Sequence, residues 1–168
     1  LGSYYLTMVR DDEPGAGKVF RNFDEAKMAY DTGVVGLHAP IRVRVSREVE
    51  GKTISRLINA TVGQIIFNDP IPQDLGFVDR TDSEKQFDLE VTFLVKKKQL
   101  GQIIDRCIRS CGTVRTSEIL DRIKNQGFKY STKSGLTVAV SDALIPANKQ
   151  ELIAQADEKV AQIKRQYD

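Results

Sequence analysis

The segment "GFKYSTKSG", residues 127–135, gathers several groups that could bind a charged ligand. It places Lys129, Tyr130 and Lys133 within five residues, together with three Ser and Thr hydroxyls. Ammonium groups and hydroxyls are common donors to phosphate oxygens. These three residues are therefore candidates for contact with a phosphate backbone or a triphosphate. The alternative is a plain connection, because the segment is expected to be a loop between a helix and a strand.

Two other motifs could indicate phosphate binding or catalysis, but the residues around them do not support either role. In "EPGAGKVF", Gly17-Lys18 is followed by Val19 where a phosphate-binding loop needs Ser or Thr, and the distal glycine is missing. We therefore expect a flexible turn there. His38 is the only histidine, and no Ser, Cys or carboxylate stands at a recognisable spacing from it. This favours a structural hydrogen bond, so no catalytic residue is assigned.

The two cysteines, Cys107 and Cys111, lie four residues apart in a helical pattern. A disulfide between such positions of one helix has poor geometry, and a metal site would need two more ligands. We expect both to be reduced residues of the core, as is typical of a cytoplasmic protein. No metal site is assigned. No apolar run approaches the ~18 residues of a membrane-spanning helix and no signal peptide is recognisable, so no membrane partner is expected.

Charge is distributed unevenly, although the net charge of the 168 residues is only +2. Residues 69–90 contain seven acidic and two basic residues, whereas residues 96–133 contain ten basic and three acidic ones. Such a local excess predicts either a basic binding face or a solvated helix surface. A net charge this close to zero gives no argument for a nucleic-acid-binding protein.

The first 60 residues predict short strands, a helix and a hairpin. Residues 4–8 suggest a strand, which breaks at a loop rich in turn residues. Asn22 and Glu25 form a capping box that predicts a helix over residues 23–31. Residues 41–58 alternate apolar and polar side chains on either side of a Glu-Gly-Lys turn, which indicates a β-hairpin.

The next segment is interpreted as scaffold. Thr61 can cap a short helix over residues 62–68 that Pro70 stops, although a strand is the alternative for so short an apolar run. Gly63 is expected to permit close packing. The polar, acidic stretch that follows predicts a loop, with a short strand as an option over residues 89–93.

The second half predicts three helices. Apolar residues at helical spacing indicate a helix over residues 95–111 and another over 117–125, which Gly127 closes. Residues 136–142 read as a strand. A capping box at Asn148 opens a last helix with one apolar stripe. The predicted fold class is thus α+β: mixed short strands and a hairpin with amphipathic helices, ending in a long helix.

Several motifs occur in one collinear order. They are "LGSYYLT" at the start, "TVGQIIFNDPIPQDLGF" at 61–77, "ILDRIKNQGFKYSTKSGLTVAVSD" at 119–142 and "KQELIAQADEKVAQIKRQY" at 149–167. Together they resemble the β′ subunit family of bacterial DNA-directed RNA polymerase, over essentially the whole chain except residues 79–90. The resemblance implies an internal fragment that follows the catalytic "NADFDGD" loop and precedes the bridge helix.

That resemblance also implies a place in the enzyme. Residues 1–142 would form a pore-type domain around the secondary channel, and residues 143–168 would begin the funnel with the first of two antiparallel rim helices. Nucleoside triphosphates enter through this channel, where Lys129, Tyr130 and Lys133 are candidate contacts. Transcript-cleavage factors insert there too. Candidate docking residues on the last helix are Glu151, Gln155, Glu158 and Lys159. The acidic segment 69–90 would lie on the outer surface.

The catalytic aspartates, zinc-binding cysteines and trigger loop of the family are not in this chain. The resemblance therefore implies no cofactor in this segment, with Mg²⁺ and Zn²⁺ held elsewhere in the subunit, and no activity of the segment alone. The implied partners are the α, β, ω and σ subunits, DNA and RNA through the whole enzyme, and transcript-cleavage factors. Some family members bind an alarmone through the helix equivalent to residues 117–125; Asp121 is retained, but Asn125 replaces their tyrosine.

Two alternatives rest on the residues alone. The basic half could make the chain a stand-alone nucleic-acid-binding module, although few aromatic residues interleave its Lys and Arg side chains. The last helix could instead make it a partner-docking module. Because the apolar stripe of that helix has no partner arm, we also expect the chain to self-associate through it.

Overall fold

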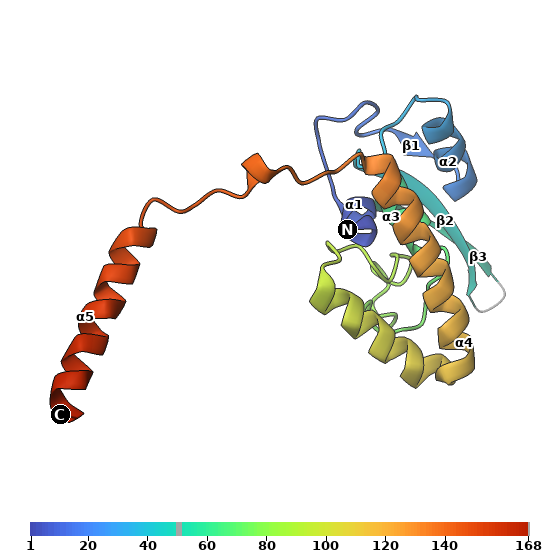
Figure 1. The fold of residues 1–168 in the computed structure, drawn as a ribbon. Helices are drawn as coiled ribbons and strands as arrows, with labels where there is room; N and C mark the ends of the chain where they lie inside the picture. The colour runs from blue at the N-terminus through green and yellow to red at the C-terminus, as the bar shows by residue number, and fades with distance from the viewer. Residues whose placement is uncertain (50–51, 168) are drawn as a thin grey trace. The chain divides into compact units, whose positions relative to one another are not determined.

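The computed structural model describes residues 1–49 and 52–167 and divides into two compact units, Leu1–Gly135 and Leu136–Asp168. The first unit contains α1 (Gly2–Thr7), β1 (Val19–Phe20), α2 (Phe23–Asp31), β2 (Ile41–Val49), β3 (Lys52–Ala60), α3 (Val62–Asn68) and α4 (Lys97–Ser134). The second contains a 3-10 turn, η1 (Val140–Asp142), and α5 (Lys149–Tyr167) (Figure 1). The α+β class and the long final helix are confirmed.

The sheet has the order β1-β2-β3, with β1 parallel to β2 and β2 antiparallel to β3. In the hairpin, Ile41 pairs with Ala60 and Val43 with Ile58, and all four side chains are buried. Arg42 and the other alternate residues of β2 face solvent, as period-2 patterning requires. The hairpin is confirmed, while the predicted turn at 50–52 falls largely outside the described residues.

Helix α3 begins with a reciprocal pair of hydrogen bonds. The Gln64 backbone N–H donates to Thr61 Oγ1, and the Thr61 N–H donates to Gln64 Oε1, both at 3.1 Å. This capping box selects the helix over the strand alternative. A Cβ on Gly63 would stand 2.2 Å from the Leu6 carbonyl oxygen, so only glycine fits where α3 meets α1. The predicted close packing is confirmed.

The core of the first unit lies where these elements meet. Helix α1 packs against both α3 and α4, and side chains of the long loop before α4 join them. The largest fully buried side chains include Phe67, Phe87, Leu6, Ile41 and Ile103. Cys107 is buried in the same core and Cys111 is half-buried, and both are free thiols as predicted.

Two short segments differ from their predicted strands. Residues 4–8 lie mostly in α1, where the Thr7 hydroxyl donates to the Ser3 carbonyl at 2.8 Å. Five residues are too few for period 2 to exclude a helix. Residues 89–93 form no strand, and the chain bends at Glu90 and Phe93. Instead the Asn68 amide donates to the Val91 carbonyl (2.8 Å) and accepts from the Val91 N–H (3.0 Å). A side chain thus takes the place of a neighbouring strand.

The second half of the first unit is more helical than predicted. Helix α4 continues to Ser134, with a kink at Gly112, and ends at the left-handed Gly135. Gly127 does not close it: a Cβ on Gly2 would lie 2.1 Å from the Gly127 carbonyl oxygen, so the two glycines mark the close approach of α1 and α4. Residues 136–142 form no strand, and their side chains are exposed. The predicted helix end at Gly127 is therefore wrong, and the left-handed glycine that ends α4 is Gly135.

Candidate ligand site beside helix α4

The residues predicted to contact phosphate lie on the last turns of α4. Lys129, Tyr130 and Lys133 are helical, so the predicted loop is wrong, but the structure does bring them together. The Lys133 ammonium nitrogen lies 5.5 Å from the Tyr130 ring centroid and 5.8 Å from that of Tyr30 on α2. The Lys129 nitrogen lies 5.6 Å from the Tyr130 centroid. Burial raises the pKa of both Tyr130 and Tyr30, so both phenols stay neutral.

A cavity of about 220 Å³ opens beside this cluster, where α2, α3 and α4 converge. It is lined by Lys27, Tyr30, Asp31, Ile66, Asp69, Gln126, Lys129 and Tyr130. Two of the three candidate residues therefore line one cavity. The sequence did not identify the α2 residues or Gln126 as part of this site, because no local pattern signals contacts between positions about 100 residues apart.

Gln126 links α4 to the end of α3. Its Nε2 donates to the Ile66 carbonyl at 2.8 Å. Its Oε1 is buried and has no hydrogen-bond partner within the described part of the chain. The Ile66 bond decides the orientation of the amide, because a flipped amide would set two oxygens against each other. Gln126 is thus a lining residue of the cavity whose acceptor oxygen is itself shielded from solvent.

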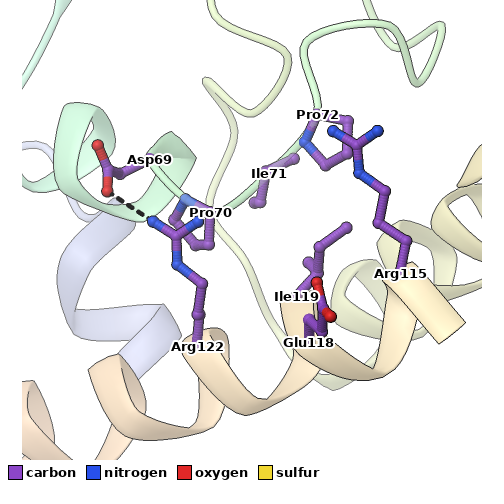
Figure 2. A pocket seen from close by; sticks show the side chains of 8 residues that line it. All are labelled: Asp69, Pro70, Ile71, Pro72, Arg115, Glu118, Ile119 and Arg122. Carbon is purple, nitrogen blue, oxygen red and sulfur yellow. Dashed lines mark hydrogen bonds and ion pairs between the residues drawn. The ribbon is translucent and has the colours of Figure 1, made fainter.

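Asp69 separates this cavity from a second one. Its Oδ1 lies 3.4 Å from Lys27 Nζ, and its Oδ2 lies 3.0 Å from Arg122 Nη2. The second cavity, about 310 Å³, lies between the 69–72 segment and α4 (Figure 2). Its lining is Asp69, Pro70, Ile71, Pro72, Arg115, Glu118, Ile119 and Arg122. Figure 2 shows the Asp69–Arg122 pair at one end of it and Arg115 at the other.

The acidic segment 69–90 was expected to lie on the outer surface, but parts of it do not. Asp69 faces the basic helix α4, and Glu90 is fully buried. Arg80 Nη2 donates to Glu90 Oε1 at 2.9 Å, and the same guanidinium donates to three backbone carbonyls of the loop. A buried carboxylate needs such a partner because desolvation penalises its charge. The segment is an ordered loop that folds around Arg80.

The remaining candidates behave as scaffold. His38 is buried and bonds to Glu13 and to the Tyr5 carbonyl, which confirms its predicted structural role. Within the described residues, no group of three His, Cys, Asp or Glu side chains is placed to hold a metal ion. No described helix combines the length and apolarity needed to cross a membrane.

The predicted docking residues lie on α5. Glu151, Gln155, Glu158 and Lys159 are all exposed, and Gln155 Nε2 donates to Glu151 Oε1 at 3.3 Å. Beside them the apolar stripe is also exposed: Leu152, Ile153, Val160, Ile163 and Tyr167 are between 45% and 90% accessible. In the part of the second unit that the structure describes, no residue covers this stripe.

Comparison with known proteins now identifies the family. The model of the family described as "RNA polymerase Rpb1, domain 3" matches residues 1–143. The chain belongs to this family. The Rpb1 domain 3 match therefore covers the whole first unit, including α4 and both cavities, and stops before α5.

Individual relatives of this Rpb1 domain 3 chain agree. It is 52% identical to the DNA-directed RNA polymerase subunit β′ of Acetivibrio thermocellus, 50% identical to that of Clostridium novyi and 52% identical to that of Caldanaerobacter subterraneus subsp. tengcongensis. Each match covers 99% of this chain but only 14% of the relative's length. The resemblance expected from the motifs is confirmed.

Proposed function

We propose that the chain is a segment of a bacterial RNA polymerase β′ subunit that lines the channel for nucleoside triphosphates and docks transcript-cleavage factors. The observation that carries the proposal is the collinear match to β′ subunits, which extends over 99% of the chain at 50–52% identity. The residues 1–142 are assigned to the pore-type wall of the channel, and residues 143–168 to the first rim helix of the funnel.

The charge of α4 supports a role in attracting triphosphates. Lys129 and Lys133 have no carboxylate partner among the described residues, so their charges are available to a polyanion. Cations along a channel wall raise the local concentration of anionic substrates and speed their entry. The wall attracts substrate and does no chemistry, so the chain alone is expected to lack nucleotidyl-transfer activity.

The exposed helix α5 supports the docking role. Its polar flank presents Glu151, Gln155, Glu158 and Lys159 beside the uncovered apolar stripe, an arrangement typical of protein interfaces. The other partners follow from the β′ assignment: the α, β, ω and σ subunits, and DNA and RNA through the whole enzyme. Mg²⁺ and Zn²⁺ would be bound by residues of the subunit that lie outside this chain. The subunit would work in the cytoplasm.

The channel role is tested in the assembled polymerase with the full-length subunit. The double change Lys129→Glu and Lys133→Glu should raise the apparent KM for nucleoside triphosphates several-fold and leave kcat unchanged. Lys124→Glu is the control, because Lys124 pairs with Asp121 on α4 and lines neither cavity. An unchanged KM in the double variant would reject the channel role.

The docking role needs a separate readout. Glu158→Lys should lower factor-stimulated transcript cleavage, whereas Asp157→Lys should not, because Asp157 lies about 100° around α5 from Glu158, on the other flank of the apolar stripe. Both changes add the same charge, so general electrostatic effects cancel in the comparison. Equal losses in the two variants would argue against a specific docking face.

A further inference from the structure

Two further cavities open where α1 packs against α4. The larger, of about 490 Å³, is bordered by Tyr4 of α1 and by the lysines at the start of α4. The smaller, of about 320 Å³, is bordered by Phe128 and its neighbours in the later turns of α4. Leu1, Ser3 and Leu100 line both. These two hollows, which we call the N-terminal cavities, therefore adjoin beside the first residue of the chain.

Large apolar side chains around the N-terminal cavities are exposed. Leu1 is 69% accessible, Phe128 is 68% accessible and Tyr4 is 37% accessible. Leu100, which lines both cavities, packs against the core and connects this surface to it. An exposed apolar surface that is also hollowed is typical of an interface with another protein segment. The exposed side chains therefore favour a covering segment over contact with water.

The position of Leu1 indicates which segment covers the cavities. The chain spans only 14% of the length of its β′ relatives, so most of such a subunit lies outside it. Consecutive Cα atoms are about 3.8 Å apart, so in a longer subunit the residue before Leu1 lies at the border of both cavities. The entropic cost of closing a loop grows with its length. The polypeptide directly before Leu1 therefore reaches this surface at a lower cost than any more distant segment.

Lys96 and Lys97 determine the charge that the covering segment carries. Both line the larger cavity, and neither pairs with a carboxylate within residues 1–49 and 52–167. A carboxylate placed beside them would be attracted by both ammonium groups. We propose that the N-terminal cavities bind the segment directly before Leu1 in the full-length subunit, through its apolar side chains and at least one Asp or Glu. The proposal rests on the proposed function, because it requires the chain to be part of a longer β′ subunit.

Photo-cross-linking in the assembled polymerase identifies the occupant. The change Phe128→p-benzoylphenylalanine is made in the full-length subunit, and the cross-linked peptides are identified by mass spectrometry after irradiation. The partner peptide should come from about fifteen residues directly before Leu1, which span at most ~50 Å when extended. The same change at Val114, which is 77% accessible on α4 and lines neither N-terminal cavity, should not capture that segment. Capture of another subunit or of a distant part of β′ by the Phe128 probe would overturn the proposal, and so would no capture at all.

A matched pair of variants measures what the contact does. Phe128→Asp in the full-length subunit should speed amide hydrogen exchange several-fold in the segment before Leu1, because a charge replaces an apolar contact, whereas Val114→Asp should not. In the 168-residue chain Phe128→Asp should leave the thermal midpoint unchanged, because Phe128 is exposed there. Unchanged exchange in the Phe128 variant would overturn the proposal.

The outcome can be told apart from that of the channel role. If the Phe128 probe captures a distant segment while the polymerase with altered Lys129 and Lys133 shows a raised KM, this interface is rejected and the channel role stands. If the probe captures the segment before Leu1 but that KM is unchanged, the interface stands and the channel role fails.

Discussion

Glu13 and His38 form a buried link between the first loop and the sheet. Glu13 Oε1 lies 2.7 Å from His38 Nδ1, and Glu13 Oε2 accepts from the His38 backbone N–H at 2.8 Å. The other ring nitrogen, Nε2, lies 2.7 Å from the Tyr5 carbonyl oxygen in α1. Both ring nitrogens thus face oxygens. One side chain thereby ties α1, the turn-rich loop and the start of β2 together.

Replacing Glu13 tests this link. Glu13→Gln keeps the shape but removes the charge, and its Nε2 replaces one of the two acceptors. We expect the free energy of unfolding to fall by about 1–3 kcal/mol, the usual cost of weakening a buried, charge-assisted hydrogen bond. Urea unfolding followed by circular dichroism measures it. Asp12→Asn, in the exposed Arg10–Asp12 pair, should change stability much less. Equal losses of unfolding free energy in the two variants would show that the Glu13–His38 contact stabilises the fold no more than an exposed ion pair does.

The contact of α3 with α1 predicts a glycine-specific effect. Gly63→Ala should destabilise the fold by about 1–3 kcal/mol, because its Cβ would meet the Leu6 backbone oxygen and neither helix can yield cheaply. Gly101→Ala is the matched control in α4, where a Cβ meets nothing within 4 Å. That change should stabilise the protein by about 0.5–1 kcal/mol. Thermal unfolding of the two variants gives opposite shifts if the packing is as described.

The two cysteines should differ in reactivity. Burial raises the pKa of the Cys107 thiol to about 11, so on the order of one molecule in a thousand carries the thiolate at pH 8. Cys111 is half-buried and more accessible. Iodoacetamide at pH 8, followed by peptide mass spectrometry, should label Cys111 first and Cys107 only as the protein unfolds. Similar labelling rates in the native protein would contradict the burial of Cys107; in 6 M guanidinium the two should react alike.

The uncovered stripe of α5 predicts self-association of the chain. Leu152 and Ile163 are both more than half exposed, and burying them against a second copy removes apolar area from water. Sedimentation velocity should show a mass that rises with protein concentration. Leu152→Lys with Ile163→Lys should leave a monomer, while Gln162→Lys, on the polar flank, should not. A wild-type chain that stays monomeric at millimolar concentration would refute the prediction.

Local chemistry made much of this fold predictable from the sequence. The caps at Asn22 and Thr61 depend on a side chain and a backbone N–H three residues away, so the pattern and the contact lie in the same short segment. The hairpin was predictable for a similar reason, since alternation along β2 mirrors which face is buried. The apolar stripe of α5 follows from helical spacing alone. The sequence also contained motifs specific enough to indicate the family.

Only the tertiary structure decided the features that depend on distant neighbours. Whether residues 4–8 form a helix, and whether Gly127 ends one, is settled by the packing of α1 on α4. Residues 89–93 are held by the Asn68 amide in place of a strand, and Lys133 meets Tyr30 across about 100 residues of chain. Lys129, Tyr130 and Lys133 are neighbours in the sequence and could be grouped from it, but the residues opposite them on α2 could not. The physical reason is that side chains brought together by folding leave no periodic or local signal in the sequence.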